Sequence, residues 1–413
     1  MELFIRPIDT QFYRGGLPFD AGEDVEATMV FPPFPRTLYG ALRTMGMISS
    51  SGNLSYSNYY GDNLQFGSLY IKGPFLARMD KFKNNTVAFP FPHDLVMQKD
   101  SFNMNYLAPV LNFSTDMGWD LDAPDIQMID QQNQNPPLAG KQVDSLADKY
   151  YLPDGSILSQ YILNTKLGNF RPRSFWLSND VVKEEFRTGI YIDNNIRTAK
   201  EGMLYRSLHF RFSDLSDIVY GYWIKVEGAD PNFPEHGYLK LGGESKVVYF
   251  TKLPNNQETS WSVFHKDIVT KILEKIKNAG RFKAYFITPS IFKKGCLPDN
   301  CSFSNNKIYL KLTNCNFSFE LVSICTTKPI HIGGWDIQKK EPKPIHKAVP
   351  AGTVYFFKAD QTQWQKLNDN EKENLAKTIY DELNFKTWCS KLPYDGEYGP
   401  GKEGFGIPLI GGW

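Results

Sequence analysis

Apolar positions near the amino terminus predict a strand followed by a helix. Residues Leu3 to Ile8 alternate between apolar and other side chains, which is typical of a short β-strand. Leu38, Leu42 and Met45 recur at the spacing of one helical face, directly after the proline-rich segment FPPFP. The first part of the chain is therefore expected to run as strand, loop and helix.

The middle of the chain contains further strand patterns and one irregular stretch. RTGIYIDNNIRTAKEGMLY, residues 187–205, predicts two strands joined by a turn at Asp193 to Asn195. Ile218 to Val226 and Tyr238 to Phe250 are also strand-like, and the second contains the glycine pair of LGGES. Between residues 84 and 160 polar residues and proline are frequent and periodicity fades. We expect an insertion that decorates the first domain; a low-complexity linker is the alternative.

The last third contains the clearest helical pattern. Residues 260–279 place five apolar side chains on one face; Thr259 or Ser260 can cap the start, and Gly280 follows the end. Strand patterns at 281–288, 321–326 and 353–357 and a second helix at 368–385 complete this region.

The length of the chain and the order of these elements predict two domains. At 413 residues the chain is long enough for two cores. The pattern changes near Asn255 and Asn256, shortly before the helix at 260–279. Each half is compatible with a ferredoxin-like β-α-β-β-α-β domain, although other α+β folds have the same elements. We therefore predict an α+β protein with domains at 1–255 and 256–413.

Composition limits the classes of partner and compartment. The net charge is +1, so any nucleic-acid site must come from local patches. The five cysteines form no CxxC pair and have no zinc-ligand spacing, which favours reduced, cytosolic thiols. The N-terminus carries charges where a signal peptide needs an apolar run, and no apolar stretch of about 20 residues occurs. We expect a soluble cytoplasmic protein with no membrane partner.

The start of the first helix combines features that suit a phosphate. Arg36 and Arg43 lie seven residues apart, away from the apolar face, and Gly40 between them has no side chain to block an approach. A helix N-terminus presents unpaired N–H groups and the positive end of the helix dipole, here beside Thr37. An ordinary amphipathic helix after a proline-rich turn is the alternative.

Three other stretches are candidates for binding. Residues 166–211 contain nine basic and five acidic residues, and arginine dominates, which suits bidentate phosphate contacts. The glycine pair of LGGES can form an anion-binding nest of backbone N–H groups or simply a tight turn. GGWDIQKKEPKPIHKAVPAG, residues 333–352, is a basic loop in which Trp335 follows two glycines, which suggests a ring able to stack on a base.

The sequence lacks the signatures of the common catalytic sites. None of the six histidines has a visible partner that would orient a general base. The chain has no HExxH, no paired acidic metal motif, no nucleophile signature, no P-loop and no dinucleotide fingerprint. We therefore expect no enzyme activity, no cofactor and no metal. If RNA cleavage were found, His93 would be the first residue to test.

Two ordered blocks near the amino terminus resemble a known family. FPPFPRTLYGALR, residues 31–43, preceded by RPIDTQFYRGGLPFDAGED, residues 6–24, is similar to the amino-terminal signature of RAMP-superfamily proteins. Specifically, it resembles subunit three of the type III-B CRISPR (Cmr) effector complex. Further similar blocks are residues 187–205, residues 333–352 and the glycine-rich tail GFGIPLIGGW, whereas 84–160 and 296–320 are not covered.

The resemblance implies a fold, a function and partners. It implies two ferredoxin-like (RRM-related) RAMP domains, with a large insertion in the first. It also implies a non-catalytic subunit that holds the 5′ tag of the guide crRNA in antiviral defence. The expected protein partners are the large polymerase/cyclase-like Cmr subunit and the neighbouring backbone RAMP subunits, and target RNA would be met only indirectly. A metal-independent CRISPR-transcript endoribonuclease of the RAMP class is the alternative, and a purely protein-binding scaffold is a third hypothesis.

The residues expected to contact RNA come from the helix start, the basic stretch and the glycine-containing loops. Arginines and lysines would contact phosphates, Trp335 or Tyr39 would stack on bases, and glycines would admit the RNA backbone. The complete set is Arg14, Gly15, Arg36, Thr37, Tyr39, Gly40, Arg43, Arg187, Arg197, Lys200, Gly242, Gly243, Gly334, Trp335, Lys343, Gly404, Gly406 and Gly411.

Overall fold

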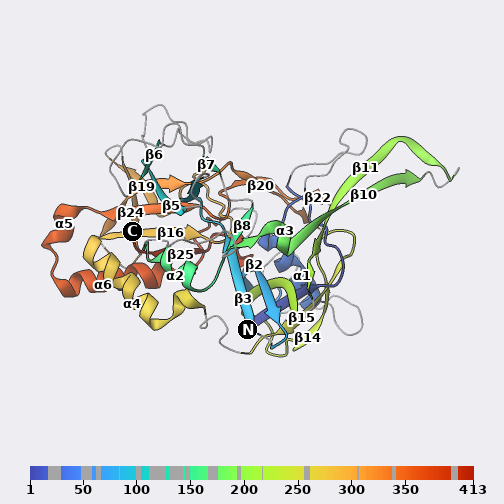
Figure 1. Ribbon diagram of the computed structural model, residues 1–413, viewed down its shortest axis with the longest axis horizontal. Coiled ribbons are helices and arrows are strands. Elements are labelled where there is room, and N and C mark those ends of the chain that lie inside the picture. The colour runs from blue at the N-terminus through green and yellow to red at the C-terminus, as the bar shows by residue number, and fades with distance from the viewer. Residues whose placement is uncertain are drawn as a thin grey trace. The chain divides into compact units, whose positions relative to one another are not determined.

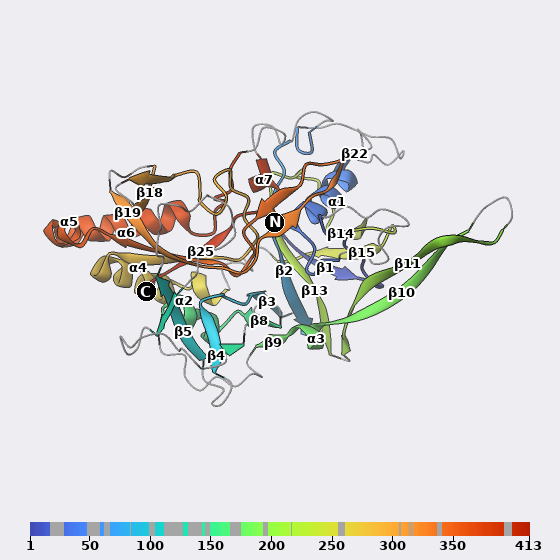
Figure 2. The same cartoon turned by 90° about the horizontal axis from the view of Figure 1, so that it is seen from above.

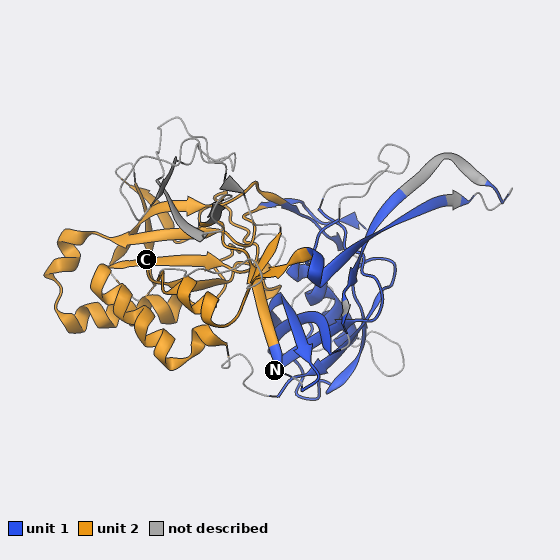
Figure 3. Ribbon diagram, viewed as in Figure 1, with its two compact units in different colours: residues 1–85, 179–254, 331–347 blue, residues 86–178, 255–330, 348–413 orange. Residues whose placement is uncertain are grey.

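The computed structural model of the chain contains two compact units (Figure 3). Unit 1 comprises residues 1–85, 179–254 and 331–347; unit 2 comprises residues 86–178, 255–330 and 348–413. The structure describes residues 1–16, 29–47, 58–61, 67–82, 84–98, 104–110, 127–130, 143–144, 149–165, 175–192, 197–215, 217–254, 261–304, 307–313, 315, 317–336, 341–391 and 399–413. The predicted division at 1–255 and 256–413 stays a prediction.

An antiparallel sheet forms the core of unit 1. Its strand order is β14-β15-β1-β13-β2, and the short β12 also pairs with β13. The strands are β1 (Glu2–Pro7), β2 (Tyr70–Asp80), β12 (Asp214–Leu215), β13 (Ile218–Glu227), β14 (His236–Lys240) and β15 (Val247–Lys252). β1 lies between β13 and β15, with Leu3 opposite both Ile224 and Lys252. The alternation predicted from Leu3 to Ile8 is therefore confirmed as a central strand.

Helix α1 (Pro35–Met47) packs on this sheet and begins as predicted, directly after the proline-rich segment. Proline at the first helical position suits the fixed φ of its ring, and its missing N–H removes no helical hydrogen bond. Leu38 and Leu42 are fully buried, whereas Met45 is only half-buried. Arg36 also proves to be buried, so the buried surface is wider than the predicted apolar face.

A long two-stranded hairpin projects beyond the sheet of unit 1 (Figures 1 and 2). Its strands are β10 (Val182–Ile192) and β11 (Ala199–Phe212), which confirms the two strands predicted within 187–205. The predicted turn at Asp193 to Asn195 lies outside the described residues. Because side chains alternate along a strand, Glu185 and Arg187 point to one face of the hairpin and Glu184 and Phe186 to the other.

Residues 331–347, which belong to unit 1, form a loop that contains β21 (Trp335–Asp336) paired with β22 (Glu341–Pro342). Two further short strands, β20 (Ile330–Ile332) and β23 (His346–Ala348), pair with each other at its two ends. The loop is therefore held by two pairs of short strands, β20 with β23 and β21 with β22.

Unit 2 is built around a six-stranded antiparallel sheet. Its order is β17-β18-β19-β24-β16-β25. The strands are β16 (Arg281–Phe286), β17 (Cys301–Ser304), β18 (Lys307–Lys311), β19 (Ser318–Cys325), β24 (Val354–Ala359) and β25 (Pro408–Gly411). Helices α4 (Lys266–Ala279) and α6 (Asp369–Leu383) pack against each other, and α5 (Gln361–Lys366) precedes α6.

Several smaller elements complete the chain. β3 (Asn85–Pro90), β8 (Tyr150–Pro153) and β9 (Trp176–Leu177) pair in that order, and a second ladder has the order β6-β5-β4-β7. The strands of that ladder are β4 (Leu95–Gln98), β5 (Met104–Val110), β6 (Gln127–Asp130) and β7 (Val143–Asp144). The remaining helices in the described ranges are α2 (Ser156–Ile162), α3 (Ser178–Val181), α7 (Gly399–Lys402) and the 3₁₀ turn η3 (Ser262–Phe264). Mixed helices and several antiparallel sheets make the fold α+β.

Two boundaries differ from the predicted elements. The helix expected from 260 begins at Lys266, because residues just before it form η3, where Trp261 at the start of the turn stacks on Phe264 at its end. Its C-terminal prediction is correct, since Gly280 adopts the left-handed conformation that ends α4. The strand expected over 238–250 is two strands, β14 and β15, separated by the loop that carries LGGES.

Candidate nucleic-acid interface

The start of α1 lies against the loop of residues 331–347. The Arg36 guanidinium donates to the carbonyl oxygen of Gly333 at 3.4 Å. On the other side of the loop, the Lys343 N–H donates to the Gly334 oxygen at 2.9 Å. A Cβ placed on Gly334 would lie 3.2 Å from Arg36 Cδ and 3.4 Å from Lys343 Cδ, so both cationic side chains run past this glycine. Trp335, next to it, is 59% exposed.

The glycine pair after Arg14 fixes a second close approach to the same loop. A Cβ on Gly16 would lie only 2.5 Å from the His331 oxygen and 2.6 Å from the Gly333 nitrogen, so no larger residue fits there. Gly15, which precedes it, is half-buried. Arg14 is exposed, and its backbone forms a β-bridge with Met29. The structure therefore brings the 14–16 segment, the start of α1 and the Trp335 loop together.

The other predicted residues of α1 have different environments. Tyr39 is 2% exposed and its hydroxyl donates to the Leu69 oxygen at 3.5 Å, so its ring lies in the core. The half-buried Arg43 donates through Nε to the Tyr60 oxygen at 2.7 Å. Thr37 is half-buried, and its N–H donates to the Phe34 oxygen at 2.9 Å. Gly40 is exposed, with open space where a Cβ would stand.

The glycine loop between β14 and β15 is held by the segment after β1. Gly242 has φ of 79°, and a Cβ there would lie 2.4 Å from the Phe12 oxygen and 2.9 Å from the Tyr13 ring. The N–H of Gly243 donates to the same Phe12 oxygen at 2.9 Å. The loop is thus a tight turn whose shape depends on glycine, and one of its predicted anion-binding N–H groups is used internally.

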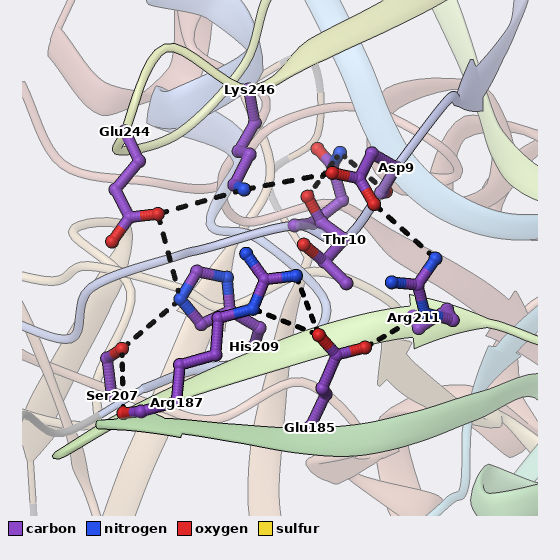
Figure 4. Close-up of polar contacts among 10 residues, drawn as sticks. Asp9, Thr10, Glu185, Arg187, Ser207, His209, Arg211, Glu244 and Lys246 are labelled. Carbon is purple, nitrogen blue, oxygen red and sulfur yellow. Dashed lines mark hydrogen bonds and ion pairs between the residues drawn. The ribbon is translucent and has the colours of Figure 1, made fainter. Parts of the chain in front are cut away.

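Arg187 lies at the base of the hairpin in a network of charged side chains (Figure 4). Glu185 accepts from Arg187 through one oxygen, at 2.9 Å from Nε and 2.6 Å from Nη2, and from Arg211 Nε through the other at 2.9 Å. Hydrogen bonds from Arg187 and then Arg211 lower the pKa of Glu185, so the carboxylate is charged at neutral pH. Arg211 also pairs with Asp9 at 3.4 Å.

The network continues to the glycine loop. Lys246 lies 3.7 Å from Glu244 and 3.9 Å from Asp9. Glu244 also lies 3.7 Å from Nε2 of His209, which contacts the Ser207 hydroxyl at 3.2 Å. The His209 side chain is fully buried, and burial lowers its pKa. These contacts join the hairpin base, the glycine loop and the end of β1.

The segment from Asp9 to Gly16 links the two groups of predicted residues. Gln11 forms a β-bridge with Phe210 of the hairpin, and Phe12 packs on His209 with ring centroids 5.0 Å apart. The same segment then supports the glycine loop through Phe12 and reaches the Trp335 loop through Gly16. This one segment therefore contacts the hairpin, the glycine loop and the Trp335 loop, which all carry predicted residues.

Five predicted residues lie apart from this arrangement or outside the description. Arg197 is exposed with φ of 53°, just before β11, and the side chain of Lys200 lies outside the described residues. The tail glycines belong to unit 2 and are buried there: Gly404, Gly406 and Gly411. A Cβ on Gly406 would lie 2.6 Å from a cysteine sulfur, and Gly411 ends β25, which pairs with β16. An RNA role for the tail stays a prediction.

Sequence reasoning missed residues that shape this surface. The sequence predicted a role for Gly15 and not for Gly16, and only the structure shows that Gly16 makes the close approach to the Trp335 loop. Glu185 lies two residues before Arg187 on β10, hence on the same face, but outside the strand predicted from residue 187. A strand predicted to begin earlier would have placed the two side chains together. Asp9 and Lys246 come from segments distant in sequence, so no local pattern indicates them.

Two other kinds of site, a metal centre and a membrane-spanning helix, are absent from the part of the chain that the structure describes. In the described ranges, no group of three or more His, Cys, Asp or Glu side chains is arranged to hold a metal ion. Helices within those ranges all lack the combination of length and apolar character needed to cross a membrane. The surface around Trp335 and the hairpin base is thus the arrangement with the most recognisable chemistry, namely cations, an exposed ring and glycine-fixed loops.

Comparison with protein families decides the identity. The family of CRISPR-associated proteins Cas_Cmr3 matches residues 3–388. The chain belongs to the Cas_Cmr3 family. The match confirms the resemblance to subunit three of the type III-B CRISPR (Cmr) effector complex, and makes the chain a Cmr3 subunit in CRISPR defence. The glycine-rich tail at 404–413 lies beyond the matched residues.

Solved structures and curated proteins complete the comparison of this Cas_Cmr3 protein. One similar chain is from a cryo-EM structure of the type III-B Cmr-beta bound to cognate target RNA; it is 15% identical, with a TM-score of 0.43 over 92% of this chain and 94% of that one. Another is from Cmr-beta bound to cognate target RNA and AMPPnP, 16% identical, with a TM-score of 0.44 over 91% and 93%. A search of curated proteins found no match.

Proposed function

We propose that this Cmr3 subunit is a non-catalytic RNA-binding protein that holds the 5′ tag of the guide crRNA on unit 1. In this proposal it docks to the large polymerase/cyclase-like Cmr subunit and to neighbouring backbone RAMP subunits, and meets target RNA only indirectly. The observation that carries the proposal is the exposed Trp335 ring beside the half-buried cationic side chain of Lys343, within a Cas_Cmr3 chain.

The chemistry of this cluster matches single-stranded RNA. An exposed aromatic ring stacks on an unpaired base, and neighbouring cations contact its phosphates. Trp335 remains 59% exposed in a loop whose backbone is fixed at Gly16, Gly333 and Gly334. A ring on a fixed loop loses little freedom when it binds, so this ring is suited to stacking on an unpaired base. Tyr39, the other stacking candidate, is in the core and is left out of the proposed contacts.

A constant tag suits such a fixed surface. A guide sequence that varies can be held only by its backbone, whereas a tag of constant sequence can also be read through its bases. The proposed surface contains both kinds of group: phosphate-binding cations at the exposed Arg14 and the half-buried Lys343, and a stacking ring at Trp335. Arg36 is buried like Tyr39 and is also left out of the proposed contacts. This combination supports binding of the tag in preference to the variable part of the guide.

Strand order supports a ferredoxin-like fold for both units. Numbered along the chain, β1, β2, β13 and β15 have the spatial order 4-1-3-2, and neighbouring strands are antiparallel. β16, β19, β24 and β25 of unit 2 have the same order. A β-α-β-β-α-β domain has this split arrangement. Unit 1 retains the helix between its first two strands, α1, and unit 2 the helix between its last two, α6.

The experiment that tests the proposal compares variants of the full chain in its host. We would recover the tagged protein, sequence the bound RNA and identify the co-purifying proteins. Wild type is expected to recover guide RNAs with one constant 5′ tag, together with a large cyclase-like subunit. Trp335→Ala is expected to weaken binding of tag RNA by about 5- to 100-fold, the range for loss of one stacked base, and Lys343→Ala added to it should weaken binding further.

A matched control separates stacking from general loss of aromatic surface. Phe82 is another exposed aromatic residue of unit 1, 74% exposed in the turn after β2, and Phe82→Ala should leave tag binding unchanged. Equal loss in both variants would contradict the assignment of the site. Recovery of neither guide RNA nor partner subunits by wild type would contradict the proposed function itself.

A further inference from the structure

At the base of the β10–β11 hairpin the carboxylate of Glu185 lies between Arg187 and Arg211 (Figure 4). The two oxygens of Glu185 take separate partners: one accepts two hydrogen bonds from Arg187, and the other accepts one from Arg211. Arg187 contributes its Nε and Nη2 side, the edge with which an arginine grips a phosphate. The carboxylate thus lies where a phosphate with two free oxygens would bridge the same guanidinium groups.

Charges within the network balance. Its cations are Arg187, Arg211 and Lys246, and its carboxylates are Asp9, Glu185 and Glu244. The buried His209 adds no charge at neutral pH, since burial lowers its pKa below an already near-neutral value. Although residues 166–211 form the most basic stretch of the sequence, the network around Arg187 and Arg211 consequently has no net charge. Its arginines can attract RNA only after they exchange the carboxylate for a phosphate.

The exposure of these side chains makes such an exchange feasible. Glu185 is 36% exposed, Arg187 38% and Arg211 48%, so water and ligand reach all three. Exposed ion pairs contribute little net stability, because solvent screens them and their side chains lose freedom. By contrast, the Lys283–Asp94 pair of unit 2 is fully buried, and no ligand can replace either partner there.

We infer that Glu185 is an internal competitor for RNA phosphate, which lets Arg187 and Arg211 bind only RNA that makes further contacts with unit 1. The inference rests on the proposed RNA-binding function and names the residue that limits it. A phosphate must displace the carboxylate to bind, so contact with the hairpin alone gains little. RNA held at the Trp335 loop as well brings its phosphates to the hairpin at high effective concentration and can displace Glu185.

The test uses the full chain and labelled oligouridylate, an RNA without a tag sequence, over a series of KCl concentrations. Glu185→Gln keeps the shape of the side chain and removes its charge. It is expected to tighten binding about three- to tenfold at low salt, as two exposed pairs are released. The slope of log K against log[KCl] should steepen by about 0.7 for each phosphate newly contacted.

Glu184→Gln is the matched control. Glu184 is the neighbouring residue on β10, is exposed and points to the opposite face, so its substitution changes the net charge equally. It should change affinity less than about twofold, the scale of one distant screened charge. Adding Arg187→Ala and Arg211→Ala to Glu185→Gln should abolish the gain, which locates the released charge at these two residues.

The outcomes separate the inference from the proposed function. Equal gains for Glu184→Gln and Glu185→Gln would mean that only net charge matters, and would overturn the inference. Weaker binding by a folded Glu185→Gln protein would also overturn it, because Glu185 would then orient the arginines for RNA. If wild type shows no salt-dependent binding to oligouridylate or tag RNA, the proposed function fails and the inference falls with it.

Discussion

Breaking the buried ion pair of unit 2 is expected to destabilise the protein far more than breaking an exposed one. Lys283 of β16 and Asp94 lie 3.6 Å apart, with side chains 0% and 1% exposed. Tyr161 joins them: its hydroxyl donates to Asp94 at 2.8 Å, and the Lys283 ammonium lies 3.6 Å from its ring centroid. Burial lowers the pKa of Lys283 to about 8 even beside Asp94. The perturbation is removal of one partner at a time.

The magnitude follows from what each variant leaves behind. Removing one partner of a buried pair typically costs about 3–5 kcal/mol, because the other charge stays uncompensated. Lys283→Met should lower the free energy of unfolding by about 3 kcal/mol, the lower end of this range. The reason is that Asp94 keeps the hydrogen bond from Tyr161 and can take up a proton. Asp94→Leu should lie near the upper end, about 5 kcal/mol, because the Tyr161 hydroxyl also loses its acceptor. The double variant leaves no buried charge and should cost less than either single variant.

Equilibrium urea unfolding at pH 7 provides the measurement. Lys358→Met is the matched control: Lys358 lies on the neighbouring strand β24, 35% exposed and 3.5 Å from Glu320, and its loss should cost no more than about 1 kcal/mol. A double-mutant cycle gives the coupling energy between Lys283 and Asp94. If the double variant costs the sum of the two single variants, the residues are not coupled and the reasoning is refuted.

Three further predictions concern single positions. Gly40→Ala should raise the free energy of unfolding, measured with urea, by about 1 kcal/mol, since the added Cβ meets open space in α1. Gly46→Ala in the same helix should lower it, because its Cβ would lie 2.2 Å from a tyrosine ring atom. If RNA also covers Gly40, the same stabilised variant will bind tag RNA more weakly than wild type. His93 has a pKa lowered to about 4 by burial, below the 6.5 of the unfolded chain, so the unfolded state binds more protons between these values. Stability should therefore fall by as much as about 3 kcal/mol as pH drops from about 6.5 to 4, and His93→Phe should flatten this part of the pH profile. Asn368→Ala removes the capping box of α6 and should cost about 1 kcal/mol in thermal unfolding, whereas Asn370→Ala, at an exposed position in the first turn, should cost little.

Local patterns predicted the elements whose cause is local. The start of α1 follows from prolines that fix the chain before it, and the hairpin follows from two β-favouring runs around turn residues. The start of α4 was wrong because its cause is tertiary. Trp261 and Val263 are buried against other parts of unit 2, and this packing holds the preceding residues in η3 although their sequence is compatible with a helix.

The sequence predicted which residues belong to the candidate site better than it predicted which side chains pair with one another. Arg36, Gly334, Trp335 and Lys343 were expected on the basis of separate motifs, and the structure brings them together although the two segments are about 300 residues apart in sequence. Which cations are already paired could not be predicted. The partners of Arg187 depend on strand register and on a loop distant in sequence, and neither leaves a mark on the local pattern.

Neutral net charge and the internal pairing of arginines have the same physical consequence. A chain with a net charge of +1 exerts almost no long-range attraction on RNA, and Glu185 pairs with two arginines of its most basic stretch. Affinity must then come from short-range contacts made in a fixed geometry. The close approaches at Gly16 and Gly242 supply that geometry, because they hold the loops in place before RNA arrives and reduce the freedom lost on binding. In the proposed function, such a surface would disfavour arbitrary RNA, which offers charge alone, and would favour one segment whose bases and phosphates fit together.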